Sequence, residues 1–242
     1  MAPDRPAGAR VLGYGTGVAL TERFTDRLRK AADPIWSAQH AHPFVRGIGD
    51  GTLSIDRFEN WVRQDYLFLI EYCRLFGLAA ARSPDLATLI RFAELLRATA
   101  VTEMSLHSEL AASLGITEAE LEGERMAPTT QAYTDFLLRT AATDDFSELC
   151  AALLPCMWGF SEIGLELAKG PRPADPRLAA WIDSYADPEF AALANWCRDL
   201  VDGLAAQAGP DLRSGMEAAF RTSSRYELAF WEMAWTKERW PV

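Results

Sequence analysis

The amino-acid sequence predicts an all-α protein, built as a single compact bundle of about eight helices. Three observations support this. Apolar residues recur with helical spacing over long stretches, strand-like alternation is scarce, and Gly- or Pro-rich breaks separate the stretches. With 242 residues, of which 49% are hydrophobic and 24% charged, the chain can bury a sizeable core. A bundle of this kind places its functional site between helices.

The N-terminal part of the chain predicts two helices separated by an ordered loop. Thr21 is a suitable N-cap for a helix that ends near residue 38, and Pro34 lies late in it, where it would bend or split it. Residues 40–52 contain three glycines and a His-Pro pair, which is typical of a loop. Ser54 then caps a long helix that ends near residue 81.

Two capping patterns mark helices in the middle of the chain. Ser83 followed by Pro84 is a cap with proline at the first helical position, and this helix is expected to end near residue 114. Thr117 with Glu120 is a capping box for a short helix. Residues 126–130 are expected to form a loop.

The most apolar helix is expected over residues 146–169, started by Asp144 or Asp145. It is apolar on nearly every face, which indicates a buried position. Pro155 inside it removes a backbone donor and predicts a kink. Residues 170–176 are expected to be a loop within one domain, because apolar helices lie on both sides. The remaining helices are expected over residues 131–142, 177–185, 188–208 and 212–235.

Charge and composition exclude several classes of protein. The formal net charge is −10 and no basic run is present, which argues against nucleic-acid binding and against an anionic membrane surface as partner. No stretch reaches about 18 successive apolar residues, so no transmembrane helix is expected. The four cysteines form no CxxC pair and are expected to be reduced thiols of a cytoplasmic protein. Residues 1–19 are expected to be a flexible arm before a helical domain over residues 20–242.

Glu103 and His107 lie four residues apart and therefore share one face of a helix. A carboxylate-bridged metal centre would use two Glu-x-x-His motifs, whereas this chain has one Glu-x-x-x-His and three histidines in all. Three interpretations stay open, which are a Glu–His hydrogen bond, support of a nearby site, and a metal site. No metal or other cofactor is expected.

Asp65 and Glu227 are acids in apolar or aromatic helical surroundings. A buried acid is costly unless it is paired, and Arg63 or Arg74 could supply the partner of Asp65. Glu227 could equally be an exposed acid. Spacing alone leaves structural and functional interpretations open for both.

Cys156 directly follows the proline of the most apolar helix. Free cysteine usually behaves as a small core residue, so the structural interpretation comes first. Phe160 lies one helical turn later on the same face. Phe68, Tyr133 and Tyr185 fit a core as easily as a pocket. Spacing therefore indicates a buried helical pocket with one thiol and two acids.

A series of short motifs occurs in order between about residues 20 and 237. They are His42-Pro43-Phe44-Val45, Gly51-Thr52-Leu53, Gln64-Asp65-Tyr66, Glu103-Met104-Ser105-Leu106-His107, Ala132-Tyr133-Thr134, Leu154-Pro155-Cys156, Trp181-Ile182 with Tyr185, and Tyr226-Glu227 with Phe230-Trp231. Each is weak alone, but together they resemble TenA proteins, also called thiaminase II or aminopyrimidine aminohydrolase. The proline–cysteine pair resembles the subgroup that uses a thiol.

The resemblance implies a haem-oxygenase-like helical bundle without haem, assembled as a homotetramer. It implies a hydrolase that releases hydroxymethylpyrimidine from 4-amino-5-aminomethyl-2-methylpyrimidine, and more slowly from thiamin, in thiamin salvage. By resemblance Cys156 is the nucleophile that adds to the pyrimidine, Asp65 the acid at the ring nitrogen, and Glu227 the acid for the leaving group or water. Tyr133 and Tyr185 match positions that border the substrate.

Phe68 and Phe160 depart from the family pattern, which commonly has tyrosine at both positions. Each keeps the ring of a substrate-binding position and lacks its hydroxyl. This departure favours, as an alternative, a non-catalytic or repurposed relative that binds a pyrimidine or thiamin. A metal-dependent oxidase on the same bundle is a further alternative, and it would need more ligands than Glu103 and His107.

Overall fold

Residues 22–241 are described by the structure, a computed structural model, and every regular element in that range is a helix. The all-α prediction is therefore confirmed. The expected arm over residues 1–19 and the expected cap Thr21 lie outside the described residues. The helices are α1 (Phe24–Ala31), α2 (Asp33–Ala41), α3 (Pro43–Asp50), α4 (Ile55–Arg82), α5 (Leu86–Arg97), the π-helix η1 (Ala98–Glu103), α6 (Met104–Ser113), α7 (Glu118–Glu122), α8 (Pro128–Thr143), α9 (Phe146–Leu167), α10 (Pro176–Tyr185), α11 (Pro188–Gln207) and α12 (Pro210–Thr236).

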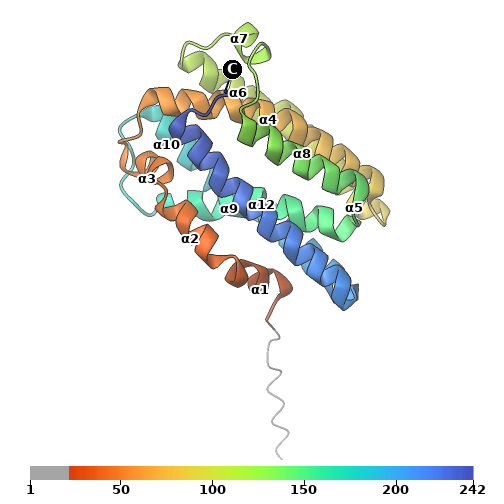
Figure 1. Cartoon of the computed structure of the whole chain (residues 1–242). Helices are drawn as coiled ribbons and strands as arrows, with labels where there is room; N and C mark the ends of the chain where they lie inside the picture. The colour runs from red at the N-terminus through yellow and green to blue at the C-terminus, as the bar shows by residue number, and fades with distance from the viewer. Residues whose placement is uncertain (1–21, 242) are drawn as a thin grey trace, which may run out of the picture.

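Helix α9 is the centre of the bundle. It packs against α12, α11, α10, α8 and α4, and Figure 1 shows it running through the middle of the molecule together with α12. It continues on both sides of Pro155, and the kink expected there stays a prediction. Among the described residues it is the one helix apolar and long enough to cross a membrane, but 72% of its most apolar stretch is buried inside the protein. Its apolar character therefore serves the core.

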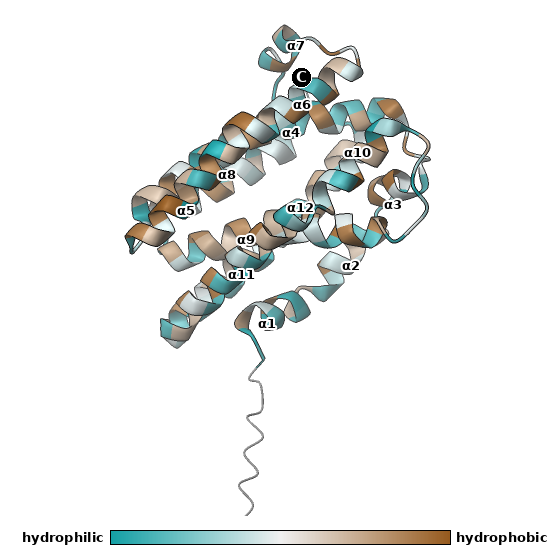
Figure 2. Ribbon diagram, turned by 180° about the vertical axis from the view of Figure 1, so that it is seen from behind, coloured by the Kyte–Doolittle hydropathy of each residue, from teal (hydrophilic) through white to brown (hydrophobic). Residues whose placement is uncertain are grey.

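The outer helices enclose α9 with amphipathic surfaces. Figure 2 shows hydrophilic and hydrophobic residues mixed along α5, α8 and α12, as expected when one face packs inward and the other meets water. The cap of α9 is a full capping box in which Asp145 and Glu148 each bond the backbone of the other. This fixes where the central helix begins.

The first expected helix is two helices, as Pro34 suggested. α1 ends at Ala31, and α2 begins at Asp33 with Pro34 in its first turn. Proline tolerates that position because the missing N–H would have no helical partner there. The prediction that proline would bend or split this segment is confirmed.

The prediction of a loop over residues 40–52 is wrong, because most of these residues are helical. α3 begins at Pro43, and His42 caps it by accepting a hydrogen bond at Nδ1 from the N–H of Phe44 at 3.2 Å. Gly51 ends it with φ 75°, a conformation that suits glycine. Gly47 permits close packing against Leu53, since an added Cβ would lie 3.1 Å from the backbone of Leu53. Glycine content alone did not reveal this helix.

The single helix expected over residues 83–114 is divided in the structure. Asp85, not Ser83, caps α5, and its Oδ1 accepts from the N–H of Thr88 at 2.8 Å. After α5 the chain forms the π-helix η1 before α6. A π-helix widens the turn and is often found at functional sites. This π-helix ends at Glu103, which faces the candidate site.

Two further boundaries were tested. The capping box of Thr117 and Glu120 is confirmed at the start of α7. The prediction of a loop over residues 126–130 is wrong for the second half of that range, because α8 already begins at Pro128. Proline suits a first helical position, so it marked the start of this helix.

Candidate active site

A small cavity lies beside the middle of α9, where side chains of α4, η1, α9, α10 and α11 meet. Its volume is about 20 Å³, room for about one water molecule and far below the range of about 300–1,000 Å³ for small-molecule sites. Its wall consists of Asp65, Phe68, Leu69, Tyr72, Glu103, Cys156, Met157, Phe160, Tyr185 and Phe190. The lining suits a single aromatic ring, and the side chains around the cavity must move apart to admit one.

The acid of α4 is held by a histidine from α6. Asp65 Oδ2 lies 2.6 Å from His107 Nε2, and His107 Nδ1 lies 3.2 Å from the backbone oxygen of Glu103. Both Asp65 and His107 are buried. Burial opposes the charged form of the imidazole, but the hydrogen bond to Asp65 and the nearby carboxylates leave the pKa of His107 raised. Burial also raises the pKa of the Glu103 carboxyl.

The thiol of Cys156 is half-buried and faces the cavity from α9. Burial, reinforced by the charges of Glu227, Asp65 and Glu103, raises its pKa well above the ordinary value. The Tyr72 hydroxyl beside it opposes this rise, and the same hydroxyl donates to the backbone oxygen of Leu153 at 3.1 Å. The resting thiol is therefore protonated at neutral pH.

The second acid, Glu227 of α12, is only 2% exposed. Its Oε1 accepts a hydrogen bond from the Tyr133 hydroxyl at 2.5 Å, and that hydroxyl lies 2.9 Å from Ser223 Oγ. Burial raises the pKa of Glu227 to about 8, while the Tyr133 hydrogen bond works in the opposite direction. At neutral pH Glu227 is therefore mostly a neutral acid.

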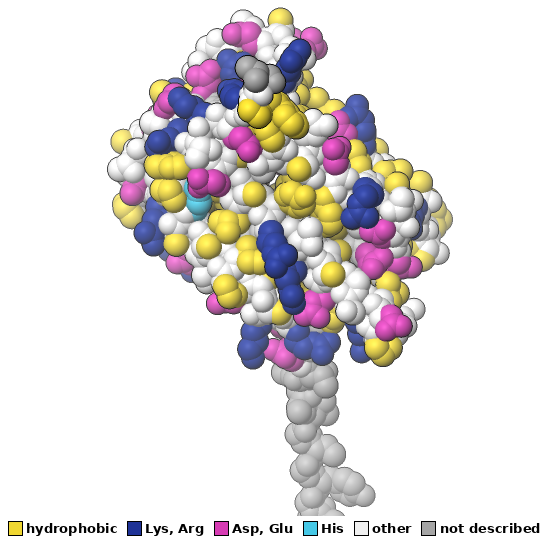
Figure 3. Space-filling model, in the orientation of Figure 1, with side chains coloured by type: hydrophobic (Ala, Val, Ile, Leu, Met, Phe, Trp, Pro, Cys, Tyr) yellow, Lys and Arg dark blue, Asp and Glu magenta, His cyan; other side chains and the backbone are white. Residues whose placement is uncertain are grey.

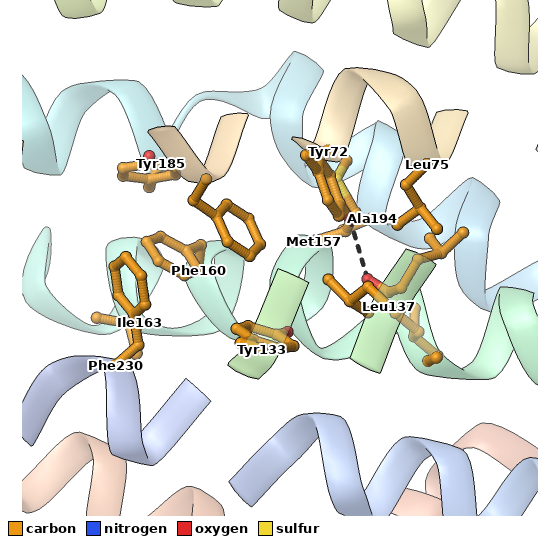
Figure 4. Close-up of a cluster of buried hydrophobic side chains, with 14 of the residues drawn as sticks. Tyr72, Leu75, Tyr133, Leu137, Met157, Phe160, Ile163, Tyr185, Ala194 and Phe230 are labelled. Atoms are coloured by element: carbon orange, nitrogen blue, oxygen red, sulfur yellow. Dashed lines mark hydrogen bonds between the residues drawn. The ribbon is translucent and has the colours of Figure 1, made fainter. Parts of the chain in front are cut away.

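Aromatic rings form the remaining wall. The rings of Phe160 and Tyr185 lie 4.9 Å apart, and Phe68 lies 5.2 Å from Tyr133 and 5.4 Å from Tyr72. Figure 4 shows Tyr185, Phe160, Tyr133 and Tyr72 around one region of the core, with Met157 between them and the Tyr72 hydrogen bond drawn as a dashed line. One of these pairs is stacked and two are tilted, and such aromatic walls suit a flat heteroaromatic ligand.

The residues predicted from sequence separate into two connected groups. Five of them line the cavity, namely Cys156, Asp65, Phe68, Phe160 and Tyr185. Tyr133 and Glu227 do not appear in that lining; they form the hydrogen-bonded pair behind it and reach the cavity through the contact of Tyr133 with Phe68.

The interpretation of Glu227 as an exposed acid is wrong, as is the expected arginine partner of Asp65. Arg63 pairs with Glu59, and Arg74 pairs with Glu71. Both arginines lie on other faces of α4 than Asp65, whose partner is a histidine.

The hydrogen bond expected between Glu103 and His107 uses the backbone oxygen of Glu103, not its side chain. His107 contacts the backbone oxygen of Glu103, and its other nitrogen meets Asp65. The interpretation of this pair as support of a nearby site therefore fits the structure.

Two residues near the site were assigned no role from the sequence. Tyr72 looked like an ordinary core position, and only its contact with Cys156 sets it apart. Gln64 is fully buried and ties the start of α8 to α4. Its Nε2 donates to the backbone oxygen of Arg125 at 2.9 Å, and its Oε1 accepts from the N–H of Ala127 and the hydroxyl of Thr130, both at 2.8 Å.

Elsewhere in the described part of the chain, the candidates for a functional site are weaker than this cavity. Within residues 22–241 no group of three or more His, Cys, Asp or Glu side chains could hold a metal ion. A larger open groove near Arg125 and Trp240 is lined by no cysteine or histidine. Figure 3 shows basic and acidic side chains interspersed on the displayed face, so this face has no continuous basic surface. The enclosed cavity at Cys156 is the best-formed candidate site.

The fold and the cavity define a class of helical bundle that encloses a thiol, buried acids and aromatic rings around a small-molecule site. The sequence model described as the TENA/THI-4/PQQC family matches residues 29–237. The chain belongs to this family.

Known proteins agree with this assignment. The chain is 42% identical over 218 residues to a protein of Halalkalibacterium halodurans named aminopyrimidine aminohydrolase, covering 90% of this chain and 97% of that one. A solved structure, the TenA homologue protein from P. horikoshii OT3, has a TM-score of 0.83 at 29% identity and covers 89% of this chain and 99% of its own.

The fold prediction is confirmed in its finer form. A domain from Shewanella denitrificans, described as having a heme oxygenase-like fold, superposes with a TM-score of 0.70 at 12% identity. It covers 88% of this chain and 92% of that one, and it supports the fold alone.

Proposed function

We propose that this protein is an aminopyrimidine aminohydrolase that releases hydroxymethylpyrimidine and ammonia from 4-amino-5-aminomethyl-2-methylpyrimidine, in thiamin salvage. The observation that carries the proposal is one cavity lined by Cys156, Asp65 and aromatic rings, with the acid Glu227 directly behind it. The name of the Halalkalibacterium halodurans relative supports the same activity.

The difficulty of the reaction is that the leaving amine departs from a carbon that no carbonyl activates. As the Cys156 sulfur adds to the ring carbon beside the substituted one, a C–S bond forms and the electron pair of the C=N bond moves onto a ring nitrogen. Asp65 carries the thiol proton to that nitrogen. Covalent addition divides one difficult step into easier ones. The aromatic walls hold the ring in the plane that this addition needs.

The protonation state of Glu227 suits it to serve the leaving group. Glu227, with its pKa of about 8, starts as an acid and gives its proton to the departing amine. Loss of ammonia leaves an exocyclic methylene on the ring. Water then adds to that methylene while the Glu227 carboxylate takes a proton from the water. The sulfur departs and takes back, through Asp65, the proton of the ring nitrogen, which restores the aromatic ring and the thiol.

The test is direct hydrolysis by the purified protein. Wild type should convert the aminomethyl substrate to hydroxymethylpyrimidine with one ammonia released per turnover. Cys156→Ala should lose this activity by several orders of magnitude, since removal of a nucleophile leaves only binding and acid catalysis. Cys73→Ala is the matched control, because that thiol lies outside the cavity lining. An inactive wild type that binds the pyrimidine tightly would instead support a repurposed binding protein, and full activity of Cys156→Ala would refute the nucleophile.

We further propose a cytoplasmic homotetramer. All four cysteines are free thiols, as expected in a reducing compartment. α5, η1 and α6 expose several large apolar side chains, which suits contact with another subunit. These are Leu86, Leu89, Ile90, Val101 and Leu106. Light scattering should give a mass of about four times 26.8 kDa, and a species of 26.8 kDa at micromolar concentration would refute the tetramer.

A further inference from the structure

His107 lies behind the cavity wall in contact with Asp65, and the proposed reaction leaves it without a role. It is 7% exposed, and both of its ring nitrogens are engaged. Nδ1 lies 3.2 Å from the backbone oxygen of Glu103, and Nε2 lies 2.6 Å from Asp65 Oδ2. Trp61 covers the ring with its centroid 5.7 Å away.

These two contacts fix where the protons are. A backbone carbonyl oxygen only accepts, so Nδ1 must carry the hydrogen that it donates to Glu103. A neutral imidazole has one N–H, so its Nε2 would then be a bare acceptor. A contact of 2.6 Å between Nε2 and Oδ2 needs a further proton between them, because two lone pairs would repel at that distance. The pair therefore holds one shared proton.

The shared proton leaves the other carboxylate oxygen free. Oδ2 is the oxygen that His107 occupies, so Oδ1 is the oxygen available on the cavity side. Whether the shared proton lies nearer to Nε2 or to Oδ2, Oδ1 carries none. Asp65 thus presents an acceptor to the cavity.

The surroundings of His107 favour placing the positive charge on its ring. The groups that face the pair are Asp65 from α4, Glu103 from η1, Cys156 from α9, Tyr185 from α10 and Glu227 from α12. All of these become neutral or negative on losing a proton. Among the described residues that line the cavity none is lysine or arginine, so the cavity wall itself supplies no cation for Asp65.

We propose that His107 is a positioning residue that, as an imidazolium, keeps Asp65 ionised so that Oδ1 can accept the thiol proton of Cys156. This rests on the proposed function. The resting thiol holds its proton, so addition needs a base. Asp65 Oδ1 takes the proton from sulfur as the C–S bond forms and passes it to the ring nitrogen, which has received the electron pair. His107 keeps its own protons throughout, and no other proton donor is needed.

The protonation state can be measured without turnover. The chain has three histidines, so ¹⁵N NMR of histidine-labelled protein should resolve each ring. One ring, absent from the spectrum of His107→Gln, should stay doubly protonated at a pH above the ordinary histidine value of about 6.5. A neutral His107 ring at pH 6.5, or one protonated only at Nε2, would overturn the proposal even if the enzyme hydrolyses its substrate.

The functional consequence appears in the pH profile. Removing a positive charge beside a carboxylate raises its pKa by about 1–3 units, so the acidic limb of kcat/KM in His107→Gln should move upward by that amount. Glutamine can still donate a hydrogen bond to Asp65 but carries no charge. His40→Gln is the matched control, since His40 also meets a carboxylate, Glu162 at 3.0 Å, away from the cavity. Its profile should match wild type.

The outcomes separate the two proposals. Loss of activity in His107→Gln at every pH with an unmoved acidic limb would show a merely structural role and overturn the assignment of His107. Wild type that releases no ammonia would overturn the proposed hydrolase and the base role of Asp65 with it, and the NMR result would still decide whether His107 is the cation.

Discussion

Replacing Glu227 by glutamine should stabilise the folded protein increasingly as the pH rises. Glu227 is 2% exposed, and its pKa is raised from 4.5 to about 8 by burial. A carboxyl with a raised pKa in the folded state binds its proton more tightly there than in the unfolded chain. Its stabilising contribution is therefore complete below pH 4.5 and is lost progressively as the pH rises to about 8.

The expected change in the free energy of unfolding follows from the interval between the two pKa values of Glu227. It spans about 3.5 pH units, and at about 1.36 kcal/mol per unit the ionised carboxylate costs about 5 kcal/mol above pH 8 and about 3 kcal/mol at pH 7. Glutamine avoids this cost and can still accept the hydrogen bond from Tyr133. Its buried amide donors offset about 1–3 kcal/mol of the gain. We therefore expect a net gain of about 0–2 kcal/mol at pH 7, and no gain or a small loss at pH 5.

Urea unfolding of both proteins at equal concentration from pH 5 to 9 measures this difference. The decisive quantity is its slope, which should approach about 1.4 kcal/mol per pH unit below pH 8 and flatten above. Glu217→Gln, at an exposed position of the same helix, is the control and should show no such slope. A difference that stays flat between pH 5 and 8 would refute the assignment of Glu227 as a buried acid.

Two further predictions concern Cys156 and Gly164. Burial raises the pKa of the Cys156 thiol, so iodoacetamide should modify this thiol slowly at pH 7 and faster as the pH rises above 9. Mass spectrometry of the free enzyme measures the rate of modification. A rate that is already maximal at pH 7 would contradict a protonated resting thiol. Gly164→Ala should cost about 1–3 kcal/mol in unfolding free energy and raise KM, because its Cβ would lie 2.5 Å from the carbonyl carbon of Tyr185. Gly203→Ala, which meets nothing within 4 Å, should stabilise by up to about 1 kcal/mol; equal effects of the two alanines would contradict the close packing.

Local sequence patterns predicted most helices but not all of their boundaries. The period of apolar residues determines whether a long stretch is helical, and this made α4, α9 and α12 evident. The short helix α3 was missed because glycines normally indicate a loop, while here Gly47 permits close packing against Leu53. The π-helix η1 left no local signal, since its extra residue per turn depends on contacts with α4 and α5.

The functional site shows a second limit of prediction from the sequence. Resemblance identified Cys156 and Asp65, and the structure places both in one cavity. The partner of Asp65 lies 42 residues away on another helix, and no periodicity within either helix relates the two. The environment of Glu227 was likewise undecided, because burial depends on what α8 and α9 place against it. Pairings between distant helices require the tertiary structure.

Gln64 has a consequence for anyone redesigning this protein. Its amide joins α4 to the first turn of α8, through Ala127 and Thr130. The neighbouring residue on α4 is Asp65, and one turn along α8 stands Tyr133, which holds Glu227. A side chain absent from the cavity wall thus links α4, which carries Asp65, to α8, which carries the partner of Glu227. A library that varied only cavity residues would leave this link in place, whereas we expect a change in the loop before α8 to shift the two acids relative to each other without touching a cavity side chain.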